Sequence, residues 1–256
     1  MEIVIIGTGN VASVLGQRLK TAGHPIKQVY GRNENSALSL ADELGAVGCS
    51  DWNAIDKEAD CYLIAFSDQA LVDRQLPLHL GDRLVVHTAG SVPMDSLGNI
   101  TTNYGVFYPL QSIRKKMDSS IPIPFLIDAV RVEAKHTLTR LAHSMGSSVA
   151  EADDEKRLRY HVSAVVANNF TNYLFTLVQD YCKKNGLDFS NLLPLLDETI
   201  SRLHRHPAVE TQTGPARRGD LATIESHLEL LKKEPELSEL YKNFSRQILD
   251  YPWTAS

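Results

Sequence analysis

A short apolar strand that runs directly into a glycine-rich turn constrains this chain more than any other feature. The strand is predicted over residues 2–6, and the turn follows as Gly7, Thr8, Gly9, Asn10, Val11 and Ala12. In such a pattern the first glycine permits a tight turn, the second lets the backbone approach a pyrophosphate, and a small third residue lets the next helix pack on the strand. A helix predicted over residues 11–22 would direct its N-terminal N–H groups at the anion. The pattern predicts a dinucleotide site in which Gly7, Thr8, Gly9, Asn10 and Val11 hold the pyrophosphate.

Strands and helices alternate through the first 152 residues. Further strands are predicted at 26–30, 46–47, 60–66, 83–87, 104–108, 125–128 and 147–150, with helices at 36–44 and 131–145. Continuous apolar runs such as residues 60–66 are typical of buried parallel strands. The alternation predicts an α/β fold with a doubly wound, Rossmann-like sheet over residues 1–152.

Strand signals vanish near Asp153, where a long helix is predicted to begin with acidic residues and to run to about Gly186. Further helices are predicted at 192–204, 220–233 and 236–249. We therefore expect an all-helical C-terminal domain over residues 153–256. Ligands of open α/β sheets bind at the carboxyl ends of the strands, so we expect this domain to cover that edge.

The composition of the chain narrows its partners. Of 256 residues, 43% are hydrophobic and 22% are charged, which suits a globular protein with a core, and the net charge of −5 does not favour nucleic acid or an anionic membrane. We expect no signal peptide, because the first residues read as a strand with an acidic residue at position 2. No apolar run reaches the roughly 18 residues that a membrane-spanning helix needs. Cys49, Cys61 and Cys182 show no CxxC spacing, which indicates a reduced, cytoplasmic protein without disulfides. Small molecules or another subunit are the expected partners.

Several histidines suggest a metal site, but their spacing does not support one. His204 and His206 would point to different faces of a helix, and His136 and His143 are too far apart to share a metal without a third ligand. We expect no bound metal.

The end of the second strand bears on the choice of nicotinamide cofactor. An NAD-specific fold usually carries Asp or Glu there to bind the ribose hydroxyl groups, whereas this chain has Gly31, Arg32 and Asn33. A guanidinium followed by an amide can bind a 2'-phosphate, so Arg32 and Asn33 favour NADP(H). In the alternative interpretation Arg32 is a solvated turn residue and Glu34 contacts the ribose.

Small or polar residues follow two other predicted strands. Ser67 and Asp68 come after the strand at 60–66, and Thr88, Ala89, Gly90 and Ser91 come after the strand at 83–87. Because the carboxyl ends of parallel strands meet at one edge of a sheet, we expect both groups to flank the nicotinamide ribose.

These segments together resemble a known family. With residues 105–111, 167–170 and 213–220, they resemble Rossmann-like NADP oxidoreductases that carry a C-terminal helical domain of unknown function. Ketopantoate reductase, pyrroline-carboxylate reductase and phosphogluconate dehydrogenase-type enzymes are distant relatives. The resemblance implies the fold and an NADP cofactor. It also implies a homodimer, because helical second domains of this superfamily commonly pair two subunits.

Several of these relatives place a lysine on the long helix, with asparagines one and two turns later. Here His161 takes the comparable place, while Asn168 and Asn169 lie seven and eight residues further on, close to the same face of an ideal helix. An imidazole can supply the proton that a ketone or imine needs as hydride arrives. Alternatively, His161 is a capping or interdomain residue. The two amides stand in an apolar stretch where burial without partners is costly, so at least one is expected to face a ligand.

Further polar residues are candidates for binding the substrate. Arg217, Arg218 and Asp220 precede a predicted helix, and the arginines could bind a carboxylate or phosphate, or they could be solvated while Asp220 caps the helix. Gln111 follows a predicted strand and could offer its amide to the same site, or it could belong to a simple turn.

Two functions of different classes follow from these residues. The first is an NADPH-dependent reductase of a small ketone or imine, with His161, Asn168 and Asn169 facing the substrate. The second is a catalytically silent NADP(H)-binding sensor or scaffold, which the missing lysine favours. A narrower third possibility, suggested by the resemblance alone, is that a deazaflavin serves as the second substrate.

Overall fold

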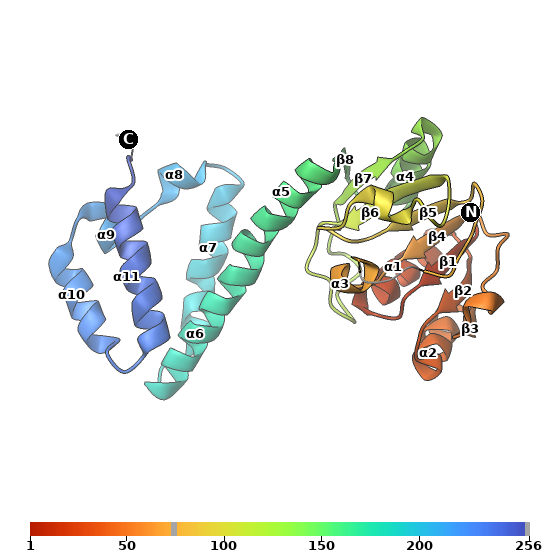
Figure 1. Cartoon of the computed structure of the whole chain (residues 1–256). Coiled ribbons are helices and arrows are strands. Elements are labelled where there is room, and N and C mark those ends of the chain that lie inside the picture. Colours follow the sequence, from red (N-terminus) through yellow and green to blue (C-terminus); the bar gives the residue numbers. More distant parts are fainter. Residues whose placement is uncertain (73–75, 254–256) are drawn as a thin grey trace. The chain divides into compact units, whose positions relative to one another are not determined.

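The chain folds into two compact units, Met1–Asn168 and Asn169–Ser256, which are described separately (Figure 1). The computed structural model describes residues 1–72 and 76–253. The first unit contains the sheet, and the second unit contains helices.

One eight-stranded sheet forms the first unit, in the order β3-β2-β1-β4-β5-β6-β7-β8. The strands are β1 (Ile3–Ile6), β2 (Ile26–Tyr30), β3 (Val47–Cys49), β4 (Cys61–Ile64), β5 (Leu84–His87), β6 (Asn103–Pro109), β7 (Phe125–Ala129) and β8 (Val149–Glu151). All neighbouring strands pair in parallel except β6 and β7, which are antiparallel. The chain moves outward from β1 in both directions, so a crevice for a ligand is expected at the carboxyl ends of β1 and β4. The predicted doubly wound sheet is confirmed.

Alternate residues of the strands face two separate hydrophobic clusters, because successive side chains of a strand point to opposite sides. Ile3 and Ile5 pack with apolar residues of helices α1 (Asn10–Thr21), α2 (Glu34–Leu44) and α4 (Val132–Ser144). Val4 and Ile6 face the other cluster, which includes residues of α3 (Asp68–Val72) and of the 3-10 helix η2 (Met94–Leu97). A further 3-10 helix, η1, spans Trp52–Ala54.

Local capping fixes where two helices of this unit begin. The Asn33 side chain accepts a hydrogen bond from the Ser36 backbone N–H at 2.9 Å and caps α2. Asp153 accepts from the Lys156 N–H at 2.8 Å and caps α5 (Asp154–Ala164). Each cap satisfies an N–H group that has no partner inside its helix.

Helices make up the second unit. They are α6 (Thr171–Lys184), η4 (Phe189–Leu192), α7 (Leu193–Leu203), α8 (Ala208–Thr211), α9 (Pro215–Arg218), α10 (Leu221–Leu230) and α11 (Pro235–Asp250). The short helices α8 and α9 were not predicted. They contain only four residues each, too few for a periodic apolar pattern to be visible in the sequence.

The long helix predicted from Asp153 is interrupted. The π-helical segment η3 (Val165–Phe170) lies between α5 and α6, and the division of the chain into two compact units falls within this segment. The predicted domain boundary after residue 152 marks the change from strands to helices, and it stays a prediction.

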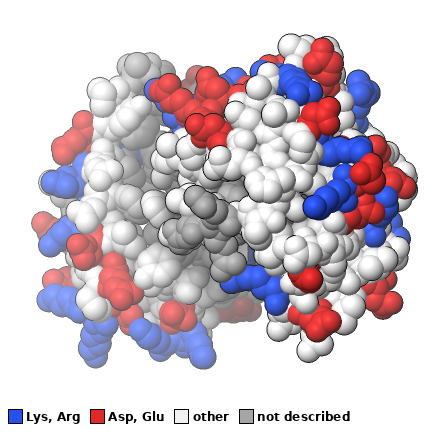
Figure 2. Space-filling view, turned by 45° about the vertical axis from the view of Figure 1, so that its right-hand side comes forward, with Lys and Arg blue, Asp and Glu red and all other residues white. Residues whose placement is uncertain are grey.

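On the face drawn in Figure 2, Lys and Arg side chains lie interspersed with Asp and Glu. Across the described residues, no helix is both long and apolar enough to cross a membrane.

Candidate functional site

The turn after β1 is shaped for close approach of the backbone. Gly7 has φ +139°, and a Cβ atom there would lie 2.5 Å from the Ala65 carbonyl oxygen at the end of β4. Only glycine fits this position without strain. Gly9 precedes α1 as its N-cap residue, and a Cβ atom built on it would meet nothing within 4 Å, so this side of the turn is open to a ligand.

A pocket of about 320 Å³ lies at this turn. Its described lining comes from the ends of three strands: Gly7, Thr8, Gly9, Gly31, Arg32, Asn33, Ala65, Phe66, Ser67 and Ala70. The pocket therefore brings together the glycine-rich turn, both residues predicted to bind the adenosine phosphate, and Ser67. Asn10 and Val11 follow in the first turn of α1, where backbone N–H groups favour an anion. The residues present fit a dinucleotide.

The residues that follow β2 leave no room for a bulky side chain at Gly31. A Cβ atom there would lie 2.5 Å from Cγ2 of Thr8. Arg32 is exposed and lines the pocket, whereas Glu34 is not among its described lining residues. The side-chain oxygen of Asn33 is engaged in capping α2, so only its amide group remains available for a phosphate.

The polar residues after β4 and β5 meet, as the parallel sheet predicts. Asp68 accepts hydrogen bonds from both the backbone N–H and the hydroxyl of Ser91, with 2.9 Å between the Ser91 nitrogen and the carboxylate. The Thr88 N–H donates to the Ile64 carbonyl at 3.1 Å, and Thr88 and Ala89 are buried. The loop that carries Thr88, Ala89, Gly90 and Ser91 is thus tied to the end of β4.

A buried histidine ends β5, which the sequence did not single out. His87 is fully buried, and its Nδ1 accepts from the Ala89 N–H at 3.2 Å. Burial, and then the positive charge of Arg157, lower the pKa of His87 to about 4. His87 is therefore neutral near pH 7.

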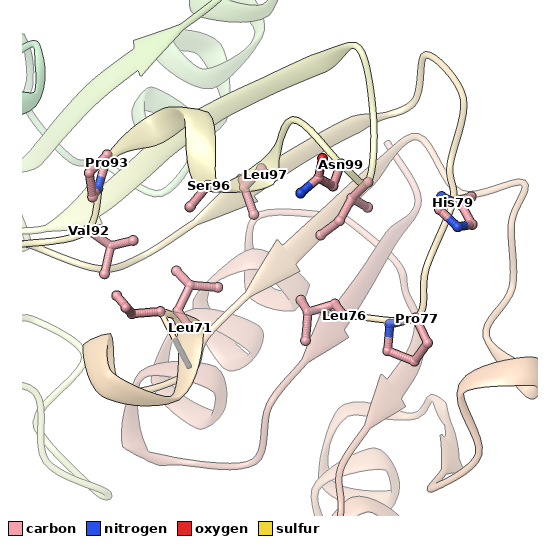
Figure 3. Close-up of a pocket in the computed structure, with 11 residues that line it drawn as sticks. Leu71, Leu76, Pro77, His79, Val92, Pro93, Ser96, Leu97 and Asn99 are labelled. Atoms are coloured by element: carbon pink, nitrogen blue, oxygen red, sulfur yellow. The ribbon is translucent and has the colours of Figure 1, made fainter. Parts of the chain in front are cut away.

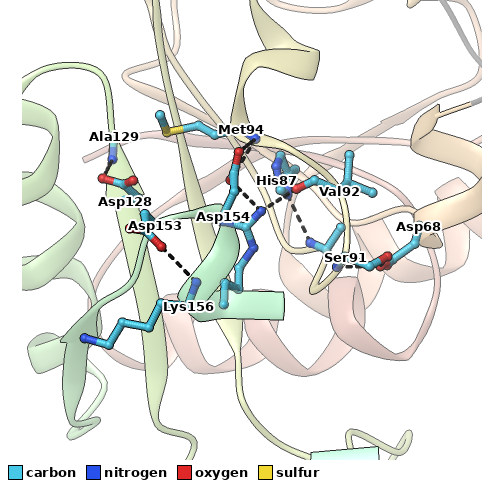
Figure 4. A network of polar contacts seen from close by, with 12 residues as sticks. Asp68, His87, Ser91, Val92, Met94, Asp128, Ala129, Asp153, Asp154 and Lys156 are labelled. Carbon is cyan, nitrogen blue, oxygen red and sulfur yellow. Dashed lines mark hydrogen bonds and ion pairs between the residues drawn. The ribbon is translucent and has the colours of Figure 1, made fainter. Parts of the chain in front are cut away.

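Arg157 and Asp154 of α5 contact the same loop, and Figure 4 shows Asp154 beside Met94. The Arg157 side chain is 1% exposed; its Nη2 donates to the Val92 carbonyl and to the Asp154 carboxylate, the latter at 2.8 Å. Asp154 also accepts from the Met94 N–H at 3.1 Å. A buried guanidinium is costly unless it is paired, so this network fixes α5 to the loop in a defined position.

One turn further along α5, His161 lies against Gly90. A Cβ atom at Gly90 would be 2.5 Å from Nδ1 of His161, so only glycine leaves room for the ring. The Tyr108 hydroxyl on β6 lies 2.9 Å from the same Nδ1, and both side chains are half-buried. His161 is thus placed at the carboxyl ends of β5 and β6, beside the loop predicted to flank the nicotinamide ribose. Arg157 and His87 are residues of this site that the sequence did not single out, and Tyr108 was expected near the cleft only as part of the segment that ends in Gln111, without its contact to His161.

Asn168 and Asn169 lie in η3, and both are exposed in the chain. Their apolar neighbours Val166 and Phe170 are exposed as well, so the burial that the sequence argument assumed is absent from the single chain. The π-helical turn also departs from ideal α-helical geometry, which was the basis for placing Asn168 and Asn169 on the same face as His161. Such turns are frequent at functional sites, and the roles of the two amides stay predictions.

The remaining predicted residues have structural partners. Gln111 donates to the Pro122 carbonyl at 3.2 Å and accepts from the Ser112 N–H at 2.8 Å. In the second unit, the Asp220 carboxylate accepts from the Thr223 N–H at 3.1 Å and from its hydroxyl at 2.7 Å, which caps α10.

The two arginines that precede Asp220 also belong to the second unit. Arg217 lies over the ring of Trp253, with 5.0 Å to the ring centre, and Arg218 is exposed. Asp220 therefore caps α10, as one of its two interpretations predicted. The substrate-binding roles of Gln111, Arg217, Arg218 and Asp220 stay predictions.

Another hollow, of about 800 Å³, lies between α3 and η2 (Figure 3). Its described lining is mainly apolar, including Leu71, Val92 and Leu97, and none of the predicted site residues is part of it. Among the residues that the structure describes, no group of three or more His, Cys, Asp or Glu side chains could hold a metal ion.

The fold, the glycine-rich turn and the pocket at the switch between β1 and β4 define a Rossmann-like nucleotide-binding protein. Two family models match the chain. The family described as "NADP oxidoreductase coenzyme F420-dependent" matches residues 2–89, and a domain of unknown function, DUF2520, matches residues 123–248.

Solved structures show the same similarity over the whole chain. A Bacteroides fragilis protein described as a "putative NADP oxidoreductase" is 36% identical, with 98% of each chain covered and a TM-score of 0.86. The chain therefore belongs to this family of NADP oxidoreductases with a C-terminal domain of unknown function. The predicted family, fold and NADP class are confirmed.

More distant structures share the fold. One is 1-pyrroline-5-carboxylate reductase from Streptococcus pyogenes, 16% identical, with 98% of this chain and 99% of the other covered and a TM-score of 0.64. Another is a reductive aminase from Aspergillus terreus in complex with NADPH and ethyl-5-oxohexanoate, 14% identical, with 98% and 94% covered and a TM-score of 0.72. Comparison with the curated proteins gives no match.

Proposed function

We propose that this protein is an NADPH-dependent reductase of a small ketone or imine, with His161 as the proton donor. The observation that carries the proposal is the position of His161, whose imidazole packs on Gly90 and lies 2.9 Å from the Tyr108 hydroxyl at the carboxyl ends of the strands. Membership of an NADP oxidoreductase family supports the reaction class.

The cofactor would be held by the turn and by the residues after β2. The N–H groups at the start of α1 would bind the pyrophosphate, and Arg32 would bind the 2'-phosphate through charge-assisted hydrogen bonds. The loop from Thr88 to Ser91 would flank the nicotinamide ribose, with Asp68 holding that loop in place. When bound, NADPH supplies the hydride.

His161 would complete the reaction with a proton. Reduction of a ketone places negative charge on oxygen, and an imine must be protonated at nitrogen before it accepts hydride readily. A positioned imidazole can serve either need, since it carries an exchangeable proton near neutral pH.

A ketone or imine is the proposed substrate class because fold neighbours act on such groups. The Aspergillus terreus reductive aminase was solved with a keto ester and NADPH, and imine reductases share the fold as well. Their identity to this chain is below 25%, so the particular substrate is left to a screen.

We also propose that the protein is a cytoplasmic homodimer that pairs through its helical unit. On α7, Leu193, Leu195, Ile200 and Leu203 are between 46% and 63% exposed. Large apolar side chains that are exposed to water on one helix favour association with a second copy. Light scattering on the purified protein would test this, and a monomer at micromolar concentration would contradict it.

The experiment for the proposed reaction has two arms. Calorimetric titration with NADPH and NADH tests the cofactor, and NADPH oxidation with a panel of ketones, cyclic imines and ketone–amine pairs tests turnover. His161→Ala should reduce turnover by about 100-fold or more while NADPH affinity is kept. The control is His136→Ala, an exposed histidine of α4, which should behave as wild type.

The outcomes separate the alternatives. Turnover that survives in His161→Ala would remove the proton-donor role. Tight NADPH binding without hydride transfer to any substrate would favour the silent sensor or scaffold, and absence of nucleotide binding would end the reductase proposal.

A further inference from the structure

The hydroxyl of Tyr108 holds one specific nitrogen of the His161 ring. It lies 2.9 Å from Nδ1, and the two rings meet edge to face at 71° with 5.9 Å between their centres. Tyr108 is itself fixed, because it belongs to β6 and pairs with Leu126 of β7 in the antiparallel ladder. The contact is therefore made from a strand, which orients the ring more rigidly than a loop residue would.

The opposite ring nitrogen has no such contact. Among the hydrogen bonds of the described residues, none involves Nε2 of His161, whereas Nδ1 is engaged by Tyr108 and packed against Gly90. The two nitrogens of an imidazole are distinct, and the hydrogen bond that one of them makes determines whether the other carries a proton. Nε2 is thus the nitrogen left for a substrate.

We propose that Tyr108 is a positioning residue that occupies Nδ1 of His161 and so makes Nε2 the atom that delivers the proton. This inference rests on the proposed reductase function. As hydride from NADPH, which becomes NADP+, forms the new C–H bond of a ketone substrate, the Nε2–H bond of the imidazolium breaks and an O–H bond forms on the product. The other proton stays bonded to Nδ1, and this N–H donates a hydrogen bond to the Tyr108 oxygen; Nε2 then takes a proton from solvent.

The surroundings suit Tyr108 to this role. Burial, and then the negative charge of Asp68, raise the pKa of Tyr108, so the phenol stays neutral at physiological pH and can accept or donate a hydrogen bond. Gly90 leaves the space in which the two rings meet.

Tyr108→Phe tests the proposal, because it removes only the hydroxyl and keeps the ring. We expect kcat for the reduction to fall about tenfold, the usual effect of losing one hydrogen bond, while KM and NADPH affinity change less than about twofold. Tyr104→Phe, on the same strand, is the matched control and should leave both parameters unchanged. In 15N-histidine spectra, assigned with His161→Ala, the Nδ1 resonance of His161 should move in Tyr108→Phe and not in the control.

Each outcome decides a different point. Unchanged kcat and an unchanged Nδ1 resonance, with turnover intact in the wild type, would overturn the role of Tyr108 and leave the reductase proposal standing. A parallel loss of NADPH affinity would show a merely structural role. Absence of turnover in the wild type would overturn the reductase proposal itself, and the inference with it.

Discussion

Replacing Gly90 with alanine would test the contact on which the proposed proton donor depends. The new Cβ atom would lie 2.5 Å from Nδ1 and 2.9 Å from Cγ of His161. Heavy atoms in good contact stand about 3.5–4.0 Å apart, so the ring or the loop has to move by about 1 Å. If the ring moves, the hydrogen bond between His161 and Tyr108 cannot keep its length of 2.9 Å.

The structure gives the size of the effect. Overpacking by one methyl group costs about 1–3 kcal/mol of stability, and a displacement of about 1 Å at a reacting group can lower the rate about 100-fold. Gly90 itself does not have a left-handed backbone conformation, so the cost comes from the clash and not from the backbone.

A double-mutant cycle isolates this clash. Urea unfolding is measured for the wild type, Gly90→Ala, His161→Ala and the double variant. In the presence of His161, Gly90→Ala should lower the free energy of unfolding by about 1–3 kcal/mol. In the His161→Ala background the loss should be much smaller, although not zero, because the new Cβ atom would still lie 3.1 Å from the Tyr108 ring. Equal costs in both backgrounds would refute the reasoning, because additive effects mean that the two residues do not touch.

Three other substitutions address the rest of the molecule. Arg32→Ala should weaken NADPH binding about 10- to 100-fold, as expected for a lost charge-assisted contact, and leave NADH affinity nearly unchanged by calorimetry; equal losses would favour the solvated-turn interpretation. The pKa of His87 is about 4 in the folded protein and about 6.5 in the unfolded chain. Between these pH values the unfolded state binds more protons, so the free energy of unfolding falls by about 3 kcal/mol as the pH drops from about 6.5 to about 4. His87→Gln should flatten this part of the stability–pH curve, and an unchanged slope would contradict the assignment. Asp220→Ala should lower stability by about 1 kcal/mol through loss of the α10 cap; an unchanged KM would leave capping as its role, whereas a large rise in KM would support the predicted substrate-binding role.

The fold was predictable because its signals are local. The turn after β1 carries its glycines at the positions where the backbone needs them, as the clash of a Cβ atom at Gly7 with Ala65 shows. The apolar run that became β4 is buried at every position, as expected for a central parallel strand. The meeting of Asp68 with Ser91 also followed from topology, since adjacent parallel strands end at the same edge.

The contacts around His161 were not predictable in this way. Gly90, Tyr108 and His161 come from a loop, a strand and a helix that are distant in sequence, and no local pattern specifies which of them will touch. From the sequence, Gly90 is expected only as a small residue near the cofactor. The structure gives it a second reason, because its missing side chain admits the His161 ring.

Helix α5 supplies the link between the cofactor loop and the proposed acid. Arg157 and His161 are four residues apart and so share one face of the helix; Arg157 binds the Val92 carbonyl while His161 rests on Gly90. The buried guanidinium is paired by Asp154, which also accepts from the Met94 N–H of the same loop. One helix therefore fixes both the loop from Thr88 to Met94 and the ring that packs on it. The distance between the proposed proton donor and the loop that would flank the nicotinamide ribose is thus determined within the first compact unit.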